Sequence, residues 1–215
     1  MVSKELSSFL HDKGFEVNNR KFKLFTFSKV YGKYSINNKK KTISFSGVFS
    51  FIVSSPLEEF CRAVVDFLIY KSYVDLGGCE VPIIGIADVS QQVTSNSIII
   101  KSLSPVVVYS TMLRPNGRKY TCYFQPGEAE YQQLIARNLI KKHTLIHKEA
   151  VPENAITIKS ASQQKLIVIN YKGTVIKGYS GKLKLSAPEL VLQTAIDAGL
   201  GSKNSQGFGC VRICE

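Results

Sequence analysis

The sequence has few acidic residues for its content of basic ones. Asp and Glu total 16 against 28 Lys and Arg in 215 residues, so the formal net charge is +12 and the pI is about 9.5. A field of this sign attracts polyanions and repels cationic partners. Nucleic acid is therefore the first class of partner to consider, and an anionic membrane surface is the second.

The five cysteines are scattered, with no Cys-x-x-Cys pair and no nearby histidine pair at zinc spacing. This pattern predicts free thiols rather than a metal site or a disulfide framework. No metal and no cofactor is expected. The cysteines are Cys61, Cys79, Cys122, Cys210 and Cys214.

Long apolar runs are also missing. No stretch approaches the roughly 18 apolar residues that a membrane-spanning helix needs, and the residues from Met1 to Glu5 do not begin a signal peptide. A hydrophobic content of 44% nevertheless predicts a folded chain. The sequence therefore predicts a cytoplasmic protein that uses no membrane.

Hydrophobic periodicity predicts helices and strands interspersed along the whole chain. In the first half we expect helices at 4–13 and 55–71 and strands at 22–30, 42–53, 73–86 and 97–102. In the second half we expect helices at 128–142 and 188–196 and strands at 106–111, 119–124, 156–160, 166–171, 175–185 and 208–213.

This order predicts an α+β fold made of two tandem ferredoxin-like (RRM-like) domains with mostly antiparallel sheets. We place the boundary near Ser102, which gives domains at 1–102 and 103–215. The first domain opens directly in a helix and lacks the N-terminal strand of such a unit. We therefore expect either that the true start lies upstream of Met1 or that the form is naturally shortened.

A glycine-rich segment, residues 199–209, separates the last predicted helix from the last predicted strand. Its four glycines permit positive φ angles and close backbone approach, so successive N–H groups could point at phosphate oxygens. The segment is not a Walker loop, because the Gly-Lys-Ser/Thr ending is absent. It is not a dinucleotide fingerprint either, because it follows a helix and enters a strand. An unliganded turn remains an alternative.

With this spacing, the segment resembles the signature loop of the repeat-associated RNA-binding (RAMP) superfamily, and specifically of the CRISPR Cas6 endoribonuclease family. Two further stretches agree with it. Residues 9–14 followed by 22–28 resemble the N-terminal block of the family, and residues 103–106 resemble the start of its second domain. The landmarks occur in the family's order over most of the chain.

The resemblance implies that the loop binds CRISPR repeat RNA, both as the precursor and as the processed guide. It also admits a homodimer and contacts with subunits of a CRISPR effector complex. The residues implied in RNA binding are Gly199, Gly201, Lys203, Asn204, Ser205, Gly207 and Gly209.

The resemblance further implies metal-independent RNA cleavage, which leaves a 2′,3′-cyclic phosphate and a 5′-OH. His11 matches the catalytic histidine of the family and Lys23 matches a lysine that stabilises developing charge. The tyrosine of some members has no equivalent before His11, so that role is unfilled, or Tyr31 or Tyr34 serves it by a different geometry. Without the resemblance, His11 reads as a solvated helix-end residue and Lys23 as an exposed strand lysine.

Two other basic clusters occur in the sequence. His143 and His147 lie among lysines, and we interpret this stretch as a phosphate-tracking or solvated face. Lys39–Lys41 is interpreted as a polar turn that could contact RNA. The alternatives to an endoribonuclease are a non-catalytic RNA-binding subunit of a CRISPR effector complex and, less favoured, a module that binds only protein.

Overall fold

The computed structural model describes residues 15–17, 20–171 and 173–214, and the helix expected at 4–13 lies outside them. The second half is organised around one four-stranded antiparallel sheet, with the strand order β12-β15-β9-β16. Its strands are β9 (Ser97–Ser102), β12 (Thr157–Ser160), β15 (Lys182–Ser186) and β16 (Val211–Ile213).

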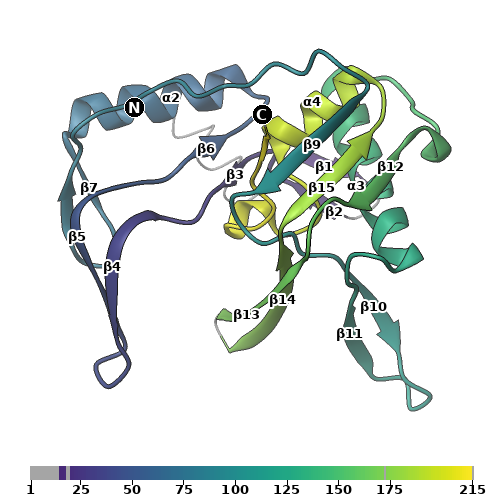
Figure 1. The fold of residues 1–215 in the computed structure, drawn as a ribbon, viewed down its shortest axis with the longest axis horizontal. Helices are drawn as coiled ribbons and strands as arrows, with labels where there is room; N and C mark the ends of the chain where they lie inside the picture. Colours follow the sequence, from purple (N-terminus) through teal and green to yellow (C-terminus); the bar gives the residue numbers. More distant parts are fainter. Residues whose placement is uncertain (1–14, 18–19, 172, 215) are drawn as a thin grey trace.

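Two helices lie against one face of this sheet (Figure 1). They are α3 (Ala129–His147) and α4 (Glu189–Ala198), and they contact each other as well as β12 and β16. The chain order β9-α3-β12-β15-α4-β16 and the strand order together are the βαββαβ arrangement of a ferredoxin-like unit. The first strand of this unit, β9, therefore lies inside the sheet, and the outer strands are β12 and β16.

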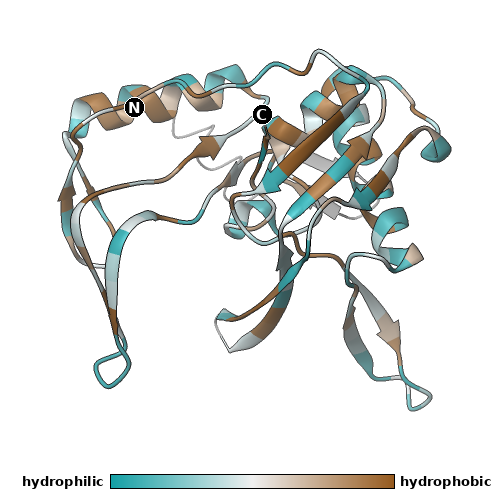
Figure 2. Ribbon diagram, viewed as in Figure 1, coloured by the Kyte–Doolittle hydropathy of each residue, from teal (hydrophilic) through white to brown (hydrophobic). Residues whose placement is uncertain are grey.

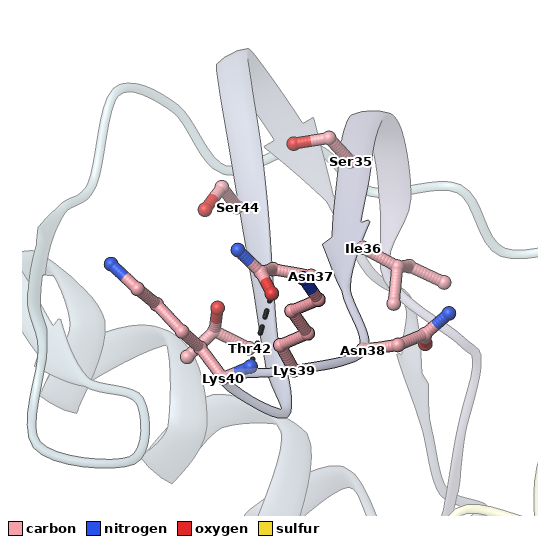
Figure 3. A pocket seen from close by; sticks show the side chains of 8 residues that line it. All are labelled: Ser35, Ile36, Asn37, Asn38, Lys39, Lys40, Thr42 and Ser44. Carbon is pink, nitrogen blue, oxygen red and sulfur yellow. Dashed lines mark hydrogen bonds between the residues drawn. The ribbon is translucent and has the colours of Figure 1, made fainter.

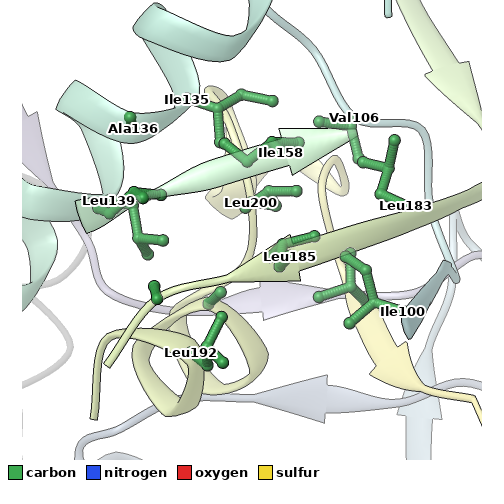
Figure 4. Close-up of a cluster of buried hydrophobic side chains, with 14 of the residues drawn as sticks. Ile100, Val106, Ile135, Ala136, Leu139, Ile158, Leu183, Leu185, Leu192 and Leu200 are labelled. Carbon is green, nitrogen blue, oxygen red and sulfur yellow. The ribbon is translucent and has the colours of Figure 1, made fainter. Parts of the chain in front are cut away.

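Alternation along the strands explains which face is covered. Ile98 and Ile100 of β9 are buried, as are Leu183 and Leu185 of β15, whereas the residues between them are exposed. These side chains meet the apolar faces of α3 and α4 in the main core, where Leu192 is fully buried (Figure 4). Period-two burial on strands facing amphipathic helices is the pattern of a two-layer α+β domain.

Two hairpins extend from the same sheet region (Figure 1). One is β10 (Tyr109–Leu113) with β11 (Lys119–Tyr123), and the other is β13 (Lys165–Tyr171) with β14 (Thr174–Ser180). The Tyr123 hydroxyl donates a hydrogen bond to the Val175 carbonyl at 3.0 Å, which connects the two hairpins.

The first half contains short antiparallel pairs and one long helix. The described residues here pair only in twos, as β1-β2, β3-β6, β4-β5 and β7-β8. The elements are β1 (Phe15–Val17), β2 (Arg20–Phe22), β3 (Thr26–Phe27), β4 (Tyr31–Asn37), β5 (Thr42–Ser50), β6 (Val53–Ser54), α2 (Glu58–Lys71), β7 (Tyr73–Asp75) and β8 (Glu80–Pro82).

The predicted α+β class with antiparallel sheets is confirmed. A second ferredoxin-like unit in the first half, and the division at Ser102, stay predictions. β9 comes just before that boundary, yet it is an inner strand of the sheet of the second half. The position of β9 in the sequence could not predict this pairing, because the strands that pair with β9 begin 80 residues later, at Lys182.

Several expected strands are shorter or divided. The expected strand 175–185 is two strands, because β14 pairs with β13 whereas β15 pairs with β9 and β12. Gly181 lies between them, where a Cβ would be within 2.7 Å of the Gln164 side chain. The expected strand 73–86 is only the short hairpin β7-β8, and α3 continues to His147 rather than ending at Lys142.

Candidate nucleic-acid interface

The glycine-rich loop leaves α4 at Gly199 and returns to the sheet at β16. Gly199, Gly201, Gly207 and Gly209 all have positive φ angles, between 71° and 84°. At Gly201 a Cβ would be 2.6 Å from the Val107 carbonyl oxygen, and at Gly209 it would overlap the Leu200 carbonyl oxygen. These positions therefore require glycine for the loop to close on itself and on the neighbouring chain.

Backbone hydrogen bonds hold the loop together and tie it to its neighbours. The Leu200 N–H donates to the Gly209 carbonyl at 2.8 Å, and the Ser202 N–H donates to the Val107 carbonyl at 2.8 Å. The Gly209 N–H donates to the Pro105 carbonyl at 2.9 Å. The expectation that successive N–H groups of the loop point at a ligand is therefore wrong for these amides, because the loop itself and residues 105–107 use them.

A buried lysine lies beneath the loop. The Lys142 ammonium on α3 donates to the carbonyls of Ala198 at 3.2 Å, Gly199 at 2.7 Å and Gly201 at 3.4 Å, and to Asn204 Oδ1 at 2.7 Å. It thus joins the C-terminal end of α4, where the helix dipole favours a cation, to the loop. Burial lowers the pKa of Lys142 to about 7. The four oxygen acceptors favour the protonated form.

The Asn204 side chain is the second fixed point of the loop. Its Nδ2 donates to the Leu200 carbonyl at 3.2 Å and to the Phe208 carbonyl at 3.1 Å, while its Oδ1 accepts from Lys142. The two donor hydrogens of this side chain are thus used inside the loop, and its acceptor is used by Lys142 of α3. Asn204 therefore shapes the loop, and the polar side chains left for a ligand include those of Lys203 and Ser205, both half-buried.

The N-terminal block, residues 22–28, packs directly on this loop. The buried Thr26 hydroxyl donates to the Phe208 carbonyl at 3.1 Å. A Cβ at Gly207 would be 2.7 Å from the Phe27 ring. Phe22 and Leu24 are buried in one cluster with Ala198 at the end of α4. Two stretches far apart in the sequence thus form one site.

Lys23 lies between Phe22 and Leu24, and its side chain is half-buried. Because its two neighbours pack beside Ala198, the backbone of Lys23 is next to the base of the glycine-rich loop. His11 lies outside the described residues. The Tyr31 hydroxyl donates to the Leu103 carbonyl at 2.9 Å, so its oxygen already joins the two halves of the chain.

A tyrosine pair lies beside the loop at the base of the β10-β11 hairpin. The rings of Tyr109 and Tyr123 are 5.9 Å apart between centroids. The Lys203 Nζ lies 5.4 Å from the centre of the Tyr109 ring, within the range of a cation–π contact. This places an ammonium and two aromatic rings together at the surface of the loop.

The two basic clusters seen in the sequence have different environments. His143 is only 1% exposed and His147 is half-buried, with ring centroids 4.6 Å apart. The interpretation of this stretch as a solvated face is thus wrong for His143 and for Lys142, because both face the core between α3 and α4. Burial, and the neighbouring His147, lower the pKa of His143.

Lys39–Lys41 form the turn between β4 and β5, as expected, and Asn37 Oδ1 accepts a hydrogen bond from the Lys40 N–H at 3.0 Å (Figure 3). The turn borders a shallow open hollow and is far from the glycine-rich loop in Figure 1.

All five cysteines are free, as the sequence predicts. Within the described residues, no group of three or more His, Cys, Asp or Glu side chains is arranged to hold a metal ion. No helix in the described part of the chain is long and apolar enough to cross a membrane.

The second half is thus a ferredoxin-like α+β unit whose last helix leads into an internally bonded glycine-rich loop. A family model, CRISPR associated protein Cas6, C-terminal, matches residues 88–213, more than half of the chain. The chain therefore belongs to the Cas6 family of CRISPR-associated proteins.

Individual proteins that this chain resembles are consistent with its membership of this family. The chain is 23% identical over 197 residues to CRISPR-associated endoribonuclease Cas6 1 of Methanocaldococcus jannaschii, covering 90% of this chain and 75% of the relative. A solved Cas6-related protein from Pyrococcus furiosus has a TM-score of 0.84 at 18% identity, covering 100% of this chain and 84% of that one. A structure described as a RAMP protein binding different RNA substrates has a TM-score of 0.81 at 18% identity, covering 100% and 85%.

Proposed function

We propose that this chain binds CRISPR repeat RNA and cleaves the precursor into guide RNAs without a metal ion. The observation that carries the proposal is the joining of residues 22–28 to the glycine-rich loop through Thr26 and Phe208. This contact brings Lys23 beside the glycine-rich loop, to which we assign RNA binding. The net charge of +12 suits a polyanionic substrate.

In the proposed reaction the ribose 2′-oxygen bonds to the adjacent phosphorus, and the bond from phosphorus to the 5′-oxygen breaks. His11 takes part in proton transfer, because the 2′-OH must lose a proton and the 5′-oxygen must gain one. Lys23 stabilises the negative charge on the phosphorane or on the leaving oxygen. The products are a 2′,3′-cyclic phosphate and a 5′-OH.

We assign the grip on the RNA backbone to the glycine-rich loop. Lys203 supplies the cation and Ser205 a hydroxyl, and both side chains are accessible. Gly199, Gly201, Gly207 and Gly209 allow the loop to adopt the shape that presents them, and Asn204 fixes that shape from inside.

The test is cleavage of the repeat RNA of the host's CRISPR array in EDTA, with analysis of the product ends. We expect cutting to a cyclic phosphate in the wild type, loss of at least about 100-fold in rate for His11→Ala, and a smaller loss for Lys23→Ala. His147→Ala and Lys33→Ala are the matched controls and should cut normally. Tight binding without cutting in the wild type would instead support the non-catalytic RNA-binding subunit.

A further inference from the structure

The ammonium beneath the glycine-rich loop is buried without a carboxylate. Lys142 is only 2% exposed, and its four acceptors are uncharged oxygens, namely three backbone carbonyls and the Asn204 side-chain amide. No ion pair in the part of the chain that the structure describes includes Lys142. Burying a charge disfavours folding, and an apolar side chain of similar size is often as good for stability or better. Core stability alone therefore does not explain a lysine at this position.

This ammonium determines how the Asn204 amide is oriented. A lysine ammonium carries only donors, so the Asn204 atom that faces Lys142 Nζ at 2.7 Å has to be Oδ1. With Oδ1 held there, Nδ2 donates to the carbonyls of Leu200 and Phe208. The reverse orientation would place Oδ1 against those two carbonyl oxygens. Lys142 therefore orients the contact that joins the two ends of the loop.

Lys203 precedes Asn204 and lies between two anchored residues. On one side the Ser202 N–H donates to the Val107 carbonyl, and on the other side Asn204 accepts from Lys142. Lys203 itself has a φ of 63° and a ψ of 28°, in the left-handed region that a residue with a Cβ rarely adopts. Such a backbone conformation persists only where its surroundings hold it. The two anchors therefore keep Lys203 in this conformation.

The backbone conformation of Lys203 also sets the direction of its side chain. Its Nζ lies 5.4 Å from the centre of the Tyr109 ring, at the surface of the loop. A change of φ to the negative values that lysine prefers would turn the Cα–Cβ bond and move the ammonium away from this place. The position of an accessible cation thus depends on a buried one.

We propose that Lys142 is a positioning residue for RNA binding, which acts through the Asn204 amide to hold the glycine-rich loop in the shape that presents Lys203 to a phosphate of the RNA. The inference rests on the proposed RNA-binding function. Lys142 itself contacts no RNA, because it is buried beneath the loop. The affinity lost on its removal should therefore be the share that Lys203 supplies.

The test is a double-mutant cycle with Lys142→Met and Lys203→Gln. Affinity for the repeat RNA is measured over a series of salt concentrations at about pH 6, where Lys142 is protonated because its pKa is about 7. Loss of one phosphate contact should weaken binding by about fourfold near physiological salt and reduce the slope of log affinity against log salt by about 0.7. We expect this effect of Lys203→Gln in the wild type and almost none in Lys142→Met.

Lys141→Met is the control of equal charge, one residue earlier on α3, where the side chain is half-buried. Lys203→Gln should keep its full effect in this background. Folding is checked by thermal unfolding without RNA. If Lys142→Met does not fold, the cycle is repeated with Lys142→Gln, which has a donor but no charge. Loss of folding in both variants would overturn the inference, because Lys142 would then hold the fold rather than position the loop.

Equal effects of Lys203→Gln in the wild type and in Lys142→Met would also overturn the inference, while leaving RNA binding by the loop intact. A residue that only stabilised the fold would give this result, because it would lower the affinity without changing what Lys203 contributes. The inference would fail as well if Lys203→Gln had no effect in a wild type that binds RNA. A wild type that binds no RNA would overturn the proposed function too.

Discussion

The two halves of the chain bury their apolar residues to very different extents. In the second half, α3 and α4 contribute eight buried apolar residues to one continuous core with the sheet. In the first half, α2 has no buried residue, and apolar side chains such as Ile69 and Tyr70 are 67% and 83% exposed. Figure 2 shows apolar segments along α2 on the side of the molecule away from the four-stranded sheet.

This difference indicates that the second half carries the stability of the molecule. The first half packs on the glycine-rich loop through residues 22–28, of which Phe22, Leu24, Thr26 and Ser28 are buried. The two halves meet where the Thr26 hydroxyl donates to the Phe208 carbonyl, so the proposed RNA site draws on both of them.

The largest effect that we expect is on the free energy of unfolding, when the truncation of a core residue is compared with that of an exposed residue. Leu192→Ala removes a fully buried side chain from α4 and should lower the free energy of unfolding by about 2–5 kcal/mol. Ile69→Ala on α2 should change it by less than about 0.5 kcal/mol. Urea unfolding followed by circular dichroism measures both, and a similar loss in the two variants would break the contrast between the halves.

The next effect, which is smaller within any single pH unit, concerns the buried cation of the second half. Because the pKa of Lys142 is about 7 in the folded state and near 10.5 when unfolded, the unfolded chain binds more protons between these values. The free energy of unfolding of the wild type should therefore rise with pH in this window, relative to Lys142→Met, by up to about 1.4 kcal/mol per pH unit.

This pH dependence is measured as the difference between the two proteins, so that groups common to both, including His143 and His147, cancel. Below pH 7 the difference should be flat, because Lys142 is then protonated in both states. A difference that stays flat up to pH 10 would show instead that the four oxygens keep the ammonium charged.

The smallest effect tests the connection between the halves. Thr26→Val removes the hydroxyl that donates to the Phe208 carbonyl and should cost about 1 kcal/mol of stability, together with weaker RNA binding. The cost is modest because the Phe208 carbonyl keeps its hydrogen bond from Asn204. Thr42→Val, at an exposed position in β5, should alter neither the melting temperature nor RNA affinity.

Part of this arrangement could be predicted from the sequence. Alternation in Lys182-Leu183-Lys184-Leu185 marks a strand with one buried and one basic face, and the glycine spacing marks the loop. The buried position of Lys142 also had a signal, because Ile135, Leu139 and Lys142 follow one another at spacings of four and then three on one helical face. The basic residues next to Lys142 in the sequence instead favoured the interpretation of the stretch as a phosphate-tracking or solvated face.

Other features could not be predicted because they depend on partners distant in sequence. The amides of Ser202 and Gly209 are used by Val107 and Pro105, which no local pattern in the loop indicates. The opposition of Lys101 to both Lys182 and Arg212 likewise follows from register, which is set only when the sheet forms.

The pairing of β16 with β9 also constrains how the protein is made. Val211 is paired with Ser102, so a ribosome must add more than 100 residues after β9 before this edge of the sheet can form. Contacts of such long sequence separation form slowly. The glycine-rich loop immediately precedes β16, so the loop and the sheet are completed together. A nascent chain interrupted before residue 211 would therefore lack the outer strand that follows the loop.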